Sequence, residues 1–292
     1  MKCVMRSLGS SAFVCGCLIF VLAGSLARAQ WQNPVIDTLT DTQLRKETTL
    51  QSLCVDDSDK VHIVWKHSVT GGWRIFYCTN SPAGTWGTPL EVADSTQLSS
   101  DPATVWSPQA MMPIVVYAQN SQILSGYLSG TSWHTDTVTS NTQLDCSPTV
   151  CVDASGLPHV AWITDDTVSG QYKIAYASSY QVGPYICYAI ETLTGSELGP
   201  YGTGASPFIA VTPQGIPHIM YRGGTYSDYH IHHAWKIIPG DTIWNYEILY
   251  SGNANDFSSS MVIEGDGDIH LAMAGNDGWG FPGRVYYMCK LQ

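Results

Sequence analysis

Hydrophobic and polar positions alternate over short stretches along almost the whole chain, and polar turns separate the stretches. This period of two predicts β-strands, and helical periodicity is nowhere convincing. Four stretches share one motif, in which a polar turn is followed by a histidine and an apolar run. They are CVDDSDKVHIVW at 54–65, CVDASGLPHVAW at 151–162, AVTPQGIPHIMY at 210–221 and VIEGDGDIHLAM at 262–273. The motif predicts a fold of repeated units.

The spacing of the repeated histidines indicates a fifth unit. His62, His159, His218 and His270 are separated by 97, 59 and 52 residues, and TVWSPQAMMPIVVY at 104–117 fits the longest gap without a histidine. Two further strand-like segments follow in each unit. The third segments are WRIFYC (73–78), YKIAYA (172–177), YHIHHA (229–234) and RVYYMC (284–289); the fourth are WGTPLEV (86–92), WHTDTV (133–138), YICYAIETL (185–193) and WNYEIL (244–249). Four-stranded units of about 50 residues predict propeller blades.

The last unit has only three strand-like segments before the chain ends at Gln292. WQNPVIDTL at 31–39 matches the fourth-strand pattern, so we expect it to pair with RVYYMC and complete the last blade. This pairing would close the ring and remove two exposed sheet edges. The sequence thus predicts an all-β, five-bladed β-propeller of four-stranded blades, with the ring closed by the N-terminal strand. A stack of separate sandwiches is the alternative.

The first 29 residues have the features of a secretory signal peptide. Lys2 and Arg6 precede the short apolar stretch AFVCGCLIFVLAG, and ARA before Gln30 fits a signal-peptidase site. We therefore expect 1–29 to be removed and 30–292 to form a single propeller domain. The protein is expected to be secreted, periplasmic or on the cell surface, without membrane insertion, and monomeric.

Charge and cysteine content narrow the possible partners. The signal segment holds three of the 13 basic residues and no acid, so the mature chain has a net charge of about −14. Such a surface repels nucleic acid. Six cysteines remain, and an oxidising compartment would permit disulfides. Cys146 and Cys151 fall on one predicted strand, too far apart to bond to each other. No cysteine or histidine spacing indicates zinc, and no cofactor is expected.

The recurring histidine has three interpretations. Because a catalytic residue is normally unique and this one occurs in four of five units, we favour a scaffold role. Its expected partner is a turn carbonyl or a hydroxyl group near the junction of the first two strands. A ring of ligand contacts and a chemical role are the alternatives. HIHH at 230–233 places His230 and His232 on one strand face without an evident third metal ligand, and EGDGD at 264–268 is best explained as a turn.

The segment SPTVCVDASGLPHVAW at 147–162, together with YKIAYA, resembles repeats of secreted bacterial sialidase-like (BNR-type) β-propellers. The resemblance extends over all five units and implies a propeller whose relatives include glycosidases and lectin-like binders. The sequence matches the sialidase Asp-box only incompletely. GYLSGTSW at 126–133 retains Gly130 and Trp133 but has Leu128 in place of Asp. The mature chain has four arginines: Arg45, Arg74, Arg222 and Arg284. Of these, Arg74, Arg222 and Arg284 could supply the arginine triad of the sialidase family.

Candidate ligand-binding residues lie in the connections between the second and third strands of each unit, where propellers often bind ligands. These connections are rich in Gly, Asp and aromatic residues, which suit stacking and hydroxyl recognition of sugars. The predicted ligand-binding residues are Trp73, Arg74, Asp165, Asp166, Tyr172, Arg222, Tyr226, Trp279 and Arg284. The alternative is that these residues only form turns and seal the blades. On the inner strands, we expect no unit to carry an acidic residue at a position where it is distinct from the residues at the equivalent positions of the other units.

These observations favour an exported binding or recognition module whose partner is a glycan or another extracellular surface ligand, without enzymatic activity. The alternative is a sialidase-like or other glycoside hydrolase, which requires two or three carboxylates converging in one pocket. A third interpretation is a structural surface protein that docks a partner through a broad apolar patch.

Overall fold

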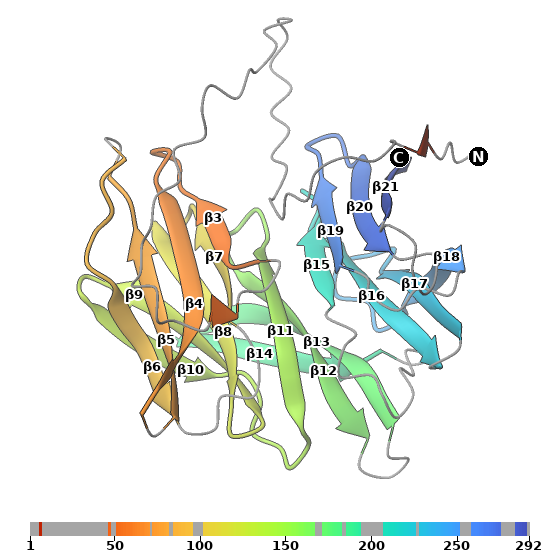
Figure 1. Cartoon of the computed structure of the whole chain (residues 1–292). Coiled ribbons are helices and arrows are strands. Elements are labelled where there is room, and N and C mark those ends of the chain that lie inside the picture. The colour runs from red at the N-terminus through yellow and green to blue at the C-terminus, as the bar shows by residue number, and fades with distance from the viewer. Residues whose placement is uncertain are drawn as a thin grey trace, which may run out of the picture.

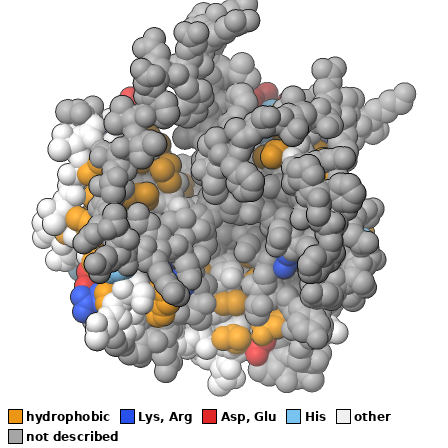
Figure 2. Space-filling model, in the orientation of Figure 1, with side chains coloured by type: hydrophobic (Ala, Val, Ile, Leu, Met, Phe, Trp, Pro, Cys, Tyr) orange, Lys and Arg blue, Asp and Glu red, His pale blue; other side chains and the backbone are white. Residues whose placement is uncertain are grey.

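The computed structural model describes residues 6–7, 46–47, 51–70, 72–81, 84–95, 102–166, 171–182, 185–193, 207–225, 228–251, 258–275 and 284–290 (Figure 1). The described strands form five antiparallel sheets, which we number in chain order. No described helix is long and apolar enough to cross a membrane. The charged side chains described on the face in Figure 2 are scattered.

Apart from β1, which joins the last sheet, each sheet is built from strands consecutive in sequence. Sheet 1 contains β3 (Leu53–Val55), β4 (Val61–Val69), β5 (Gly72–Thr79) and β6 (Leu90–Ser95), with β2 (Lys46–Glu47) on the same edge of β4 as β3. Sheet 2 contains β7 (Ala103–Ser107), β8 (Met112–Gln119), β9 (Gln122–Ser129) and β10 (Ser132–Thr137). Sheet 3 contains β11 (Asp145–Val152), β12 (Pro158–Asp166), β13 (Gln171–Val182) and β14 (Tyr185–Thr192).

Sheet 4 contains β15 (Phe208–Val211), β16 (Pro217–Thr225), β17 (Asp228–Trp235) and β18 (Asn245–Ser251). Sheet 5 contains β19 (Ser258–Ile263), β20 (Ile269–Gly275) and β21 (Arg284–Lys290), with β1 (Arg6–Ser7) on the free edge of β21. The histidine runs form second strands, and the third and fourth segments also form strands as predicted, except that in the segment 86–92 the strand begins only at Leu90. This confirms an all-β fold with five antiparallel sheets, four with four strands and one with a short fifth strand, consistent with a propeller.

The core lies between successive sheets. One hydrophobic cluster joins each consecutive pair, from sheets 1 and 2 to sheets 4 and 5. Neighbouring residues of one strand face different clusters: Val160 packs toward sheet 2, whereas Ala161 packs toward sheet 4. A strand with both faces buried reads as an apolar run instead of an alternating one. This explains the runs that follow the repeated histidines.

The first strands of the sheets lie side by side in the order β3, β7, β11, β15 and β19 (Figure 1). Gln51 links three of these sheets, because its carbonyl accepts a hydrogen bond from the Thr104 amide at 2.8 Å and its side chain accepts one from the Val150 amide at 2.9 Å. The predicted closing strand, 31–39, lies outside the described residues. In the structure β1 takes that edge, with Arg6 opposite Tyr287. Closure of the ring therefore remains a prediction.

The six cysteines after the signal segment are all free thiols. Cys146 and Cys151 both lie on β11, as expected from the sequence. Burial raises the pKa of Cys54 to about 12 and that of Cys146 to about 11. The thiols of these two residues are therefore protonated at neutral pH.

Candidate functional site

The repeated histidine makes the same contacts in sheets 1, 3 and 5. Its Nδ1 atom meets a tyrosine hydroxyl on the third strand, and its Nε2 atom faces a carboxylate in the preceding turn. The sets are Asp56, His62 and Tyr77 (3.4 and 2.5 Å), Asp153, His159 and Tyr176 (3.5 and 2.6 Å), and Glu264, His270 and Tyr287 (2.9 and 2.5 Å). A contact made three times by the architecture agrees with the scaffold interpretation. The partners are a hydroxyl group, as expected, and a turn carboxylate.

The proton positions in sheet 3 follow from these partners. The Asp153 carboxylate only accepts, so His159 carries its proton on Nε2, and the Tyr176 hydroxyl donates to Nδ1. Burial lowers the pKa of His159, against the opposing influence of Asp153. Burial also raises the pKa of Tyr176. At neutral pH this group is therefore a neutral phenol bound to a neutral imidazole.

Sheet 4 replaces the tyrosine with a second histidine. His218 Nδ1 donates to His233 Nε2 at 2.9 Å, and His233 Nδ1 donates to Glu247 Oε1 at 2.8 Å. Lys290 of sheet 5 donates to the same carboxylate oxygen at 2.9 Å. Hydrogen bonding from His233 and Lys290 lowers the pKa of Glu247 to about 2, and burial lowers that of His218 to about 3.

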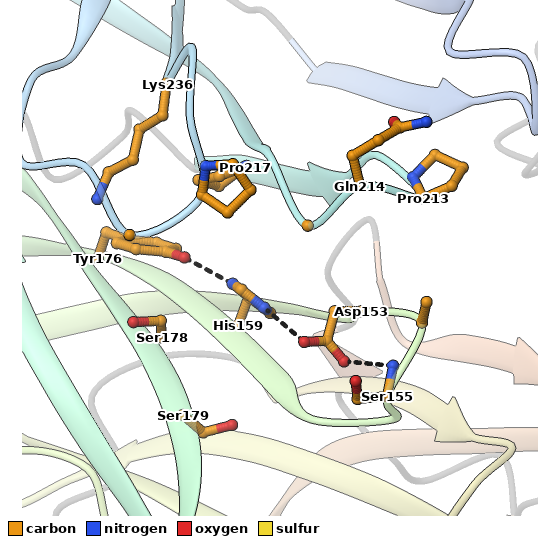
Figure 3. A pocket seen from close by; sticks show the side chains of 14 residues that line it. Asp153, Ser155, His159, Tyr176, Ser178, Ser179, Pro213, Gln214, Pro217 and Lys236 are labelled. Carbon is orange, nitrogen blue, oxygen red and sulfur yellow. Dashed lines mark hydrogen bonds and ion pairs between the residues drawn. The ribbon is translucent and has the colours of Figure 1, made fainter.

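A cavity of about 300 Å³ opens between sheets 3 and 4 (Figure 3). Asp153 and His159 line one side, from the β11–β12 turn and the start of β12. Pro213 and Gln214 line the other, from the β15–β16 turn, and Lys236 follows β17. Figure 3 shows Tyr176, His159 and Asp153 in a row along the sheet 3 side.

The equivalent place between sheets 1 and 2 is covered by a tryptophan. Trp106 stacks on His62, with ring centroids 4.9 Å apart. Trp106 lies opposite Pro113 in its sheet, and the corresponding position in sheet 4, opposite Pro217, is Val211. A smaller side chain thus stands where a tryptophan covers the same histidine network elsewhere.

Lysine side chains join neighbouring sheets beside these networks. Lys236 of sheet 4 is 5% exposed and donates a hydrogen bond to Glu191 of sheet 3. Its ammonium group lies 5.3 Å from the ring centroid of Tyr176 and 5.0 Å from that of Trp244. Lys290 holds the same strand position in sheet 5, and its ammonium lies 4.4 Å from the Trp235 ring centroid. Each lysine therefore connects its sheet to the preceding one.

The predicted ligand residues of sheet 1 lie at the start of β5. The Lys66 ammonium lies 4.7 Å from the Trp73 ring centroid, a cation–π contact. Arg74 forms an ion pair with Glu91 at 2.9 Å, in which both side chains are about 40% exposed. This ion pair gives Arg74 a partner within its own sheet.

In sheet 3, Asp165 and Tyr172 lie opposite each other on β12 and β13. The Asp165 carboxylate accepts a hydrogen bond from the Leu144 amide at 2.7 Å, and its carbonyl accepts one from the Gln143 side chain at 2.9 Å. Asp165 thus fixes the segment that enters sheet 3 from sheet 2.

Asp145 is a residue that the sequence interpretation missed. It begins β11 and is fully buried, and its carboxylate accepts hydrogen bonds from the Trp162 indole at 3.0 Å and the Asn141 amide at 3.2 Å. The corresponding sequence position of the last unit is Asp256, which lies outside the described residues, so the expectation about inner-strand acids stays a prediction. A possible sequence signal is Trp162 itself, because a buried indole N–H requires an acceptor.

The other predicted ligand residues are placed only in part. Arg222 lies on β16 opposite Ile231. Asp166 ends β12 and Arg284 begins β21, but their side chains lie outside the described part of the chain, as do Tyr226 and Trp279 entirely. Register places Asp165, Asp166, Arg222 and Arg284 at the ends of their sheets where the second and third strands connect.

Among the described residues, no group of three or more His, Cys, Asp or Glu side chains could hold a metal ion. His230 and His232 do lie on one strand, with ring centroids 6.0 Å apart, as the HIHH pattern suggested. His232 stacks on Tyr221 at 5.1 Å. This stacking gives His232 a packing role.

No protein-family model matches the sequence, and no curated protein matches it. The fold is similar to that of a protein of unknown function from Dyadobacter fermentans, with a TM-score of 0.59 and 11% identity, covering 82% of this chain and 75% of that one. It is also similar to a PL25 ulvan lyase bound to -[GlcA(1-4)Rha3S]-, with a TM-score of 0.53 and 11% identity. That match covers 80% of this chain and 62% of the lyase, less than two thirds of its length.

A third similar structure is an α-L-arabinanase from Penicillium chrysogenum complexed with arabinobiose. The TM-score is 0.51 and the identity 10%, covering 80% of this chain and 78% of the arabinanase. At these identities the likeness is one of fold. The structural neighbours thus include propeller-like enzymes that act on glycans, whereas membership of the BNR-type family is not shown.

The comparisons correct the prediction of a binding module without enzymatic activity. Similar structures with a stated activity include a polysaccharide lyase and an arabinanase, and both are enzymes. The alternative in the sequence interpretation, a sialidase-like or other glycoside hydrolase, agrees better with these similar structures.

Proposed function

We propose that this protein is a carbohydrate-processing enzyme, and specifically a glycoside hydrolase. The observation that carries the proposal is the similarity of fold to the arabinanase, which extends over about four fifths of both chains. A fold by itself does not determine an activity, so the assignment rests on an experiment on this chain.

The proposed substrate site is the end of the sheets where second and third strands connect. Connections carried on a rigid scaffold are common places for binding and catalytic residues. Trp73 and Tyr172 supply aromatic rings there, and Asp165 supplies a half-buried carboxylate. The proposed ligand residues are Trp73, Arg74, Asp165, Asp166, Tyr172, Arg222, Tyr226, Trp279 and Arg284.

Hydrolysis requires one carboxyl group to protonate the leaving oxygen and a second to activate water or attack the sugar. Asp165 and Asp166 are successive strand residues, so their side chains point to opposite faces and cannot form this pair. We propose Asp165 as one member. Asp228 and Asp277, in the corresponding connections of other sheets, are the candidates for the second.

The charge of the chain favours a neutral substrate. The formal net charge is −11, and a surface of this sign repels polyanionic glycans. A polysaccharide lyase is the second candidate, because the ulvan lyase similarity has the higher TM-score of 0.53. A lyase substrate carrying uronate groups would have to overcome the unfavourable charge.

The test is to incubate the protein with neutral polysaccharides, including arabinan and xylan, and with acidic ones, including ulvan. New reducing ends without ultraviolet absorbance from an unsaturated product indicate hydrolysis, and new absorbance indicates elimination. Asp165→Asn should lower the rate at least about 100-fold if Asp165 is a catalytic carboxyl group. Asp57→Asn, in an exposed turn at the opposite end of sheet 1, is the control and should retain activity. Absence of cleavage of every substrate contradicts the proposal.

We also propose the finer architecture expected from the sequence. After removal of residues 1–29, residues 31–39 would occupy the free edge of β21 and close a ring of five blades. The mature domain would then be exported as a monomer. The recurrence of the fourth-strand pattern at 31–39 supports this arrangement.

A further inference from the structure

We propose that the cavity between sheets 3 and 4 is a second binding site, which takes one neutral sugar unit and is separate from the proposed site of cleavage. The cavity is lined by the β11–β12 and β15–β16 turns, whereas cleavage is proposed where β12 connects to β13. The nine residues of β12 separate these two ends by roughly 25 Å. One sugar could therefore occupy the cavity while another region of the glycan is processed.

The size of the cavity suits a single sugar. Its volume of about 300 Å³ lies at the small end of the range for ligand pockets, which is about 300–1,000 Å³. Three prolines from sheet 4 and its connection, Pro213, Pro217 and Pro239, contribute apolar rings to the lining. Such rings can pack against the C–H face of a pyranose or furanose.

The polar groups of the cavity have unused hydrogen-bonding capacity. Asp153 Oδ1 accepts hydrogen bonds from the Ser155 amide at 2.8 Å and the Leu157 amide at 3.0 Å, whereas Oδ2 has a 3.5 Å contact to His159. Ser179 is 8% exposed, and its hydroxyl oxygen has no hydrogen-bond partner among the described residues. A buried hydroxyl without a partner carries a desolvation cost that a ligand hydroxyl would remove.

The charges at the cavity favour a neutral ligand over an anion. The Lys236 ammonium is neutralised by Glu191, which leaves the Asp153 carboxylate facing the cavity. Burial keeps His159 uncharged at neutral pH by lowering its pKa. Sugar hydroxyl groups can donate to a carboxylate, whereas a phosphate or uronate would be repelled by it.

The acid, histidine and tyrosine network forms the rigid wall of this site. The same acid, histidine and tyrosine arrangement occurs in sheets 1 and 5, so it does not by itself indicate a ligand. Access distinguishes sheet 3 from sheet 1: Trp106 stacks on His62, whereas the corresponding strand position in sheet 4 holds Val211. The Val211→Trp substitution should therefore fill the cavity by copying an arrangement that the molecule already contains.

The experiment is ligand-observed NMR with arabinose, xylose, glucose and galactose, and with glucuronate and inorganic phosphate as anionic probes. We expect the wild-type chain to bind at least one neutral sugar at millimolar concentration and to bind it better than either anion. Val211→Trp should weaken binding at least about tenfold because it occupies the sugar volume. Ile263→Trp, at the same strand position in sheet 5, is the matched control and should bind like wild type.

A second variant keeps the test decisive if Val211→Trp does not fold. Gln214 is exposed on the cavity rim, so Gln214→Ala should preserve the fold and weaken sugar binding about fivefold. The proposal is overturned if no neutral sugar binds, if the anions bind better, or if Gln214→Ala and a folded Val211→Trp both bind like wild type. Binding that depends on these residues without glycan cleavage would sustain this site and refute the proposed enzyme. If folded Val211→Trp loses both sugar binding and glycan cleavage, the two sites are not separate.

Discussion

At the scale of single residues, the main feature is the repeated contact among a turn acid, a histidine and a third-strand tyrosine. The histidine was recognisable in the sequence because it recurs, and its scaffold role followed from that recurrence. Its tyrosine partner was less evident, because the pairing depends on register: His159 lies opposite Ser178, two residues beyond Tyr176. In sheet 4 His233 takes the place of the tyrosine and also hydrogen-bonds the repeated histidine.

Tyr176→Phe should lower the free energy of unfolding by about 1–2 kcal/mol, because it leaves His159 Nδ1 buried without a donor. Tyr287→Phe removes the equivalent hydroxyl in sheet 5 and should cost less than about 0.5 kcal/mol. The difference arises from exposure, which is 2% for Tyr176 and 44% for Tyr287. Urea unfolding of both variants measures it, and equal losses would contradict the role assigned to burial.

Stability should decrease as the pH falls below about 6.5. Burial lowers the pKa values of His159, His218 and His233 in the folded state, so the unfolded chain binds more protons than the folded chain. The stabilisation is complete above the unfolded value and is lost toward the folded value, which is about 3 for His218. Each histidine contributes a slope of up to about 1.4 kcal/mol per pH unit.

Urea unfolding across this range measures the slope. His218→Gln should make it shallower, whereas His134→Gln, on the exposed surface, should leave it unchanged. An identical slope in wild type and His218→Gln would contradict a neutral, buried His218.

At the scale of elements, strands and their order could be predicted, but the contacts between turns could not. The apolar runs identified β4, β12, β16 and β20 because a strand buried on both faces has a strong sequence signal. Gly156 has no such signal. It lies in the β11–β12 turn with a φ of 75°, and a Cβ atom there would approach Gln109 Cβ to 2.6 Å. The turn of sheet 3 is therefore fitted against that of sheet 2.

Gly156→Ala should lower the free energy of unfolding by about 2–4 kcal/mol, because it combines left-handed backbone strain with a collision between sheets. Gly240→Ala has nearly the same φ, 77°, and open space around the new methyl group. It should cost only about 1 kcal/mol. Chemical unfolding measures both losses of free energy, and their difference gives the cost of the collision alone. Similar losses would show that the two turns can move apart freely.

Lysines that connect sheets provide a second comparison between elements. Lys236→Met leaves the Glu191 carboxylate without its buried partner and should cost about 2–4 kcal/mol. Lys290→Met removes the corresponding link from a side chain that is 37% exposed, so it should cost less than about 1 kcal/mol. Thermal or urea unfolding tests the order of the two effects, and the reverse order would contradict this account.

At the scale of the whole molecule, the repeats predicted five sheets of four strands, and the structure has five sheets, four with four strands and sheet 1 with five. The sequence did not reveal the cavity between sheets 3 and 4, because its lining comes from both sheets: His159 and Pro213, for example, lie 54 positions apart. It also led to the wrong general function. Repetition argued against chemistry at the histidines, but it could not exclude chemistry in the connections, where the units differ from one another.

The most direct test of the central claim is the fate of water during glycan cleavage. The mature chain is incubated with neutral polysaccharides in isotopically labelled water, and the products are examined by mass spectrometry. Hydrolysis predicts one labelled oxygen atom at each newly formed reducing end, whereas the new non-reducing end keeps the unlabelled glycosidic oxygen, and it predicts loss of this product in Asp165→Asn. Unlabelled, unsaturated products would show elimination instead, and intact polysaccharide after prolonged incubation would contradict an enzymatic function altogether.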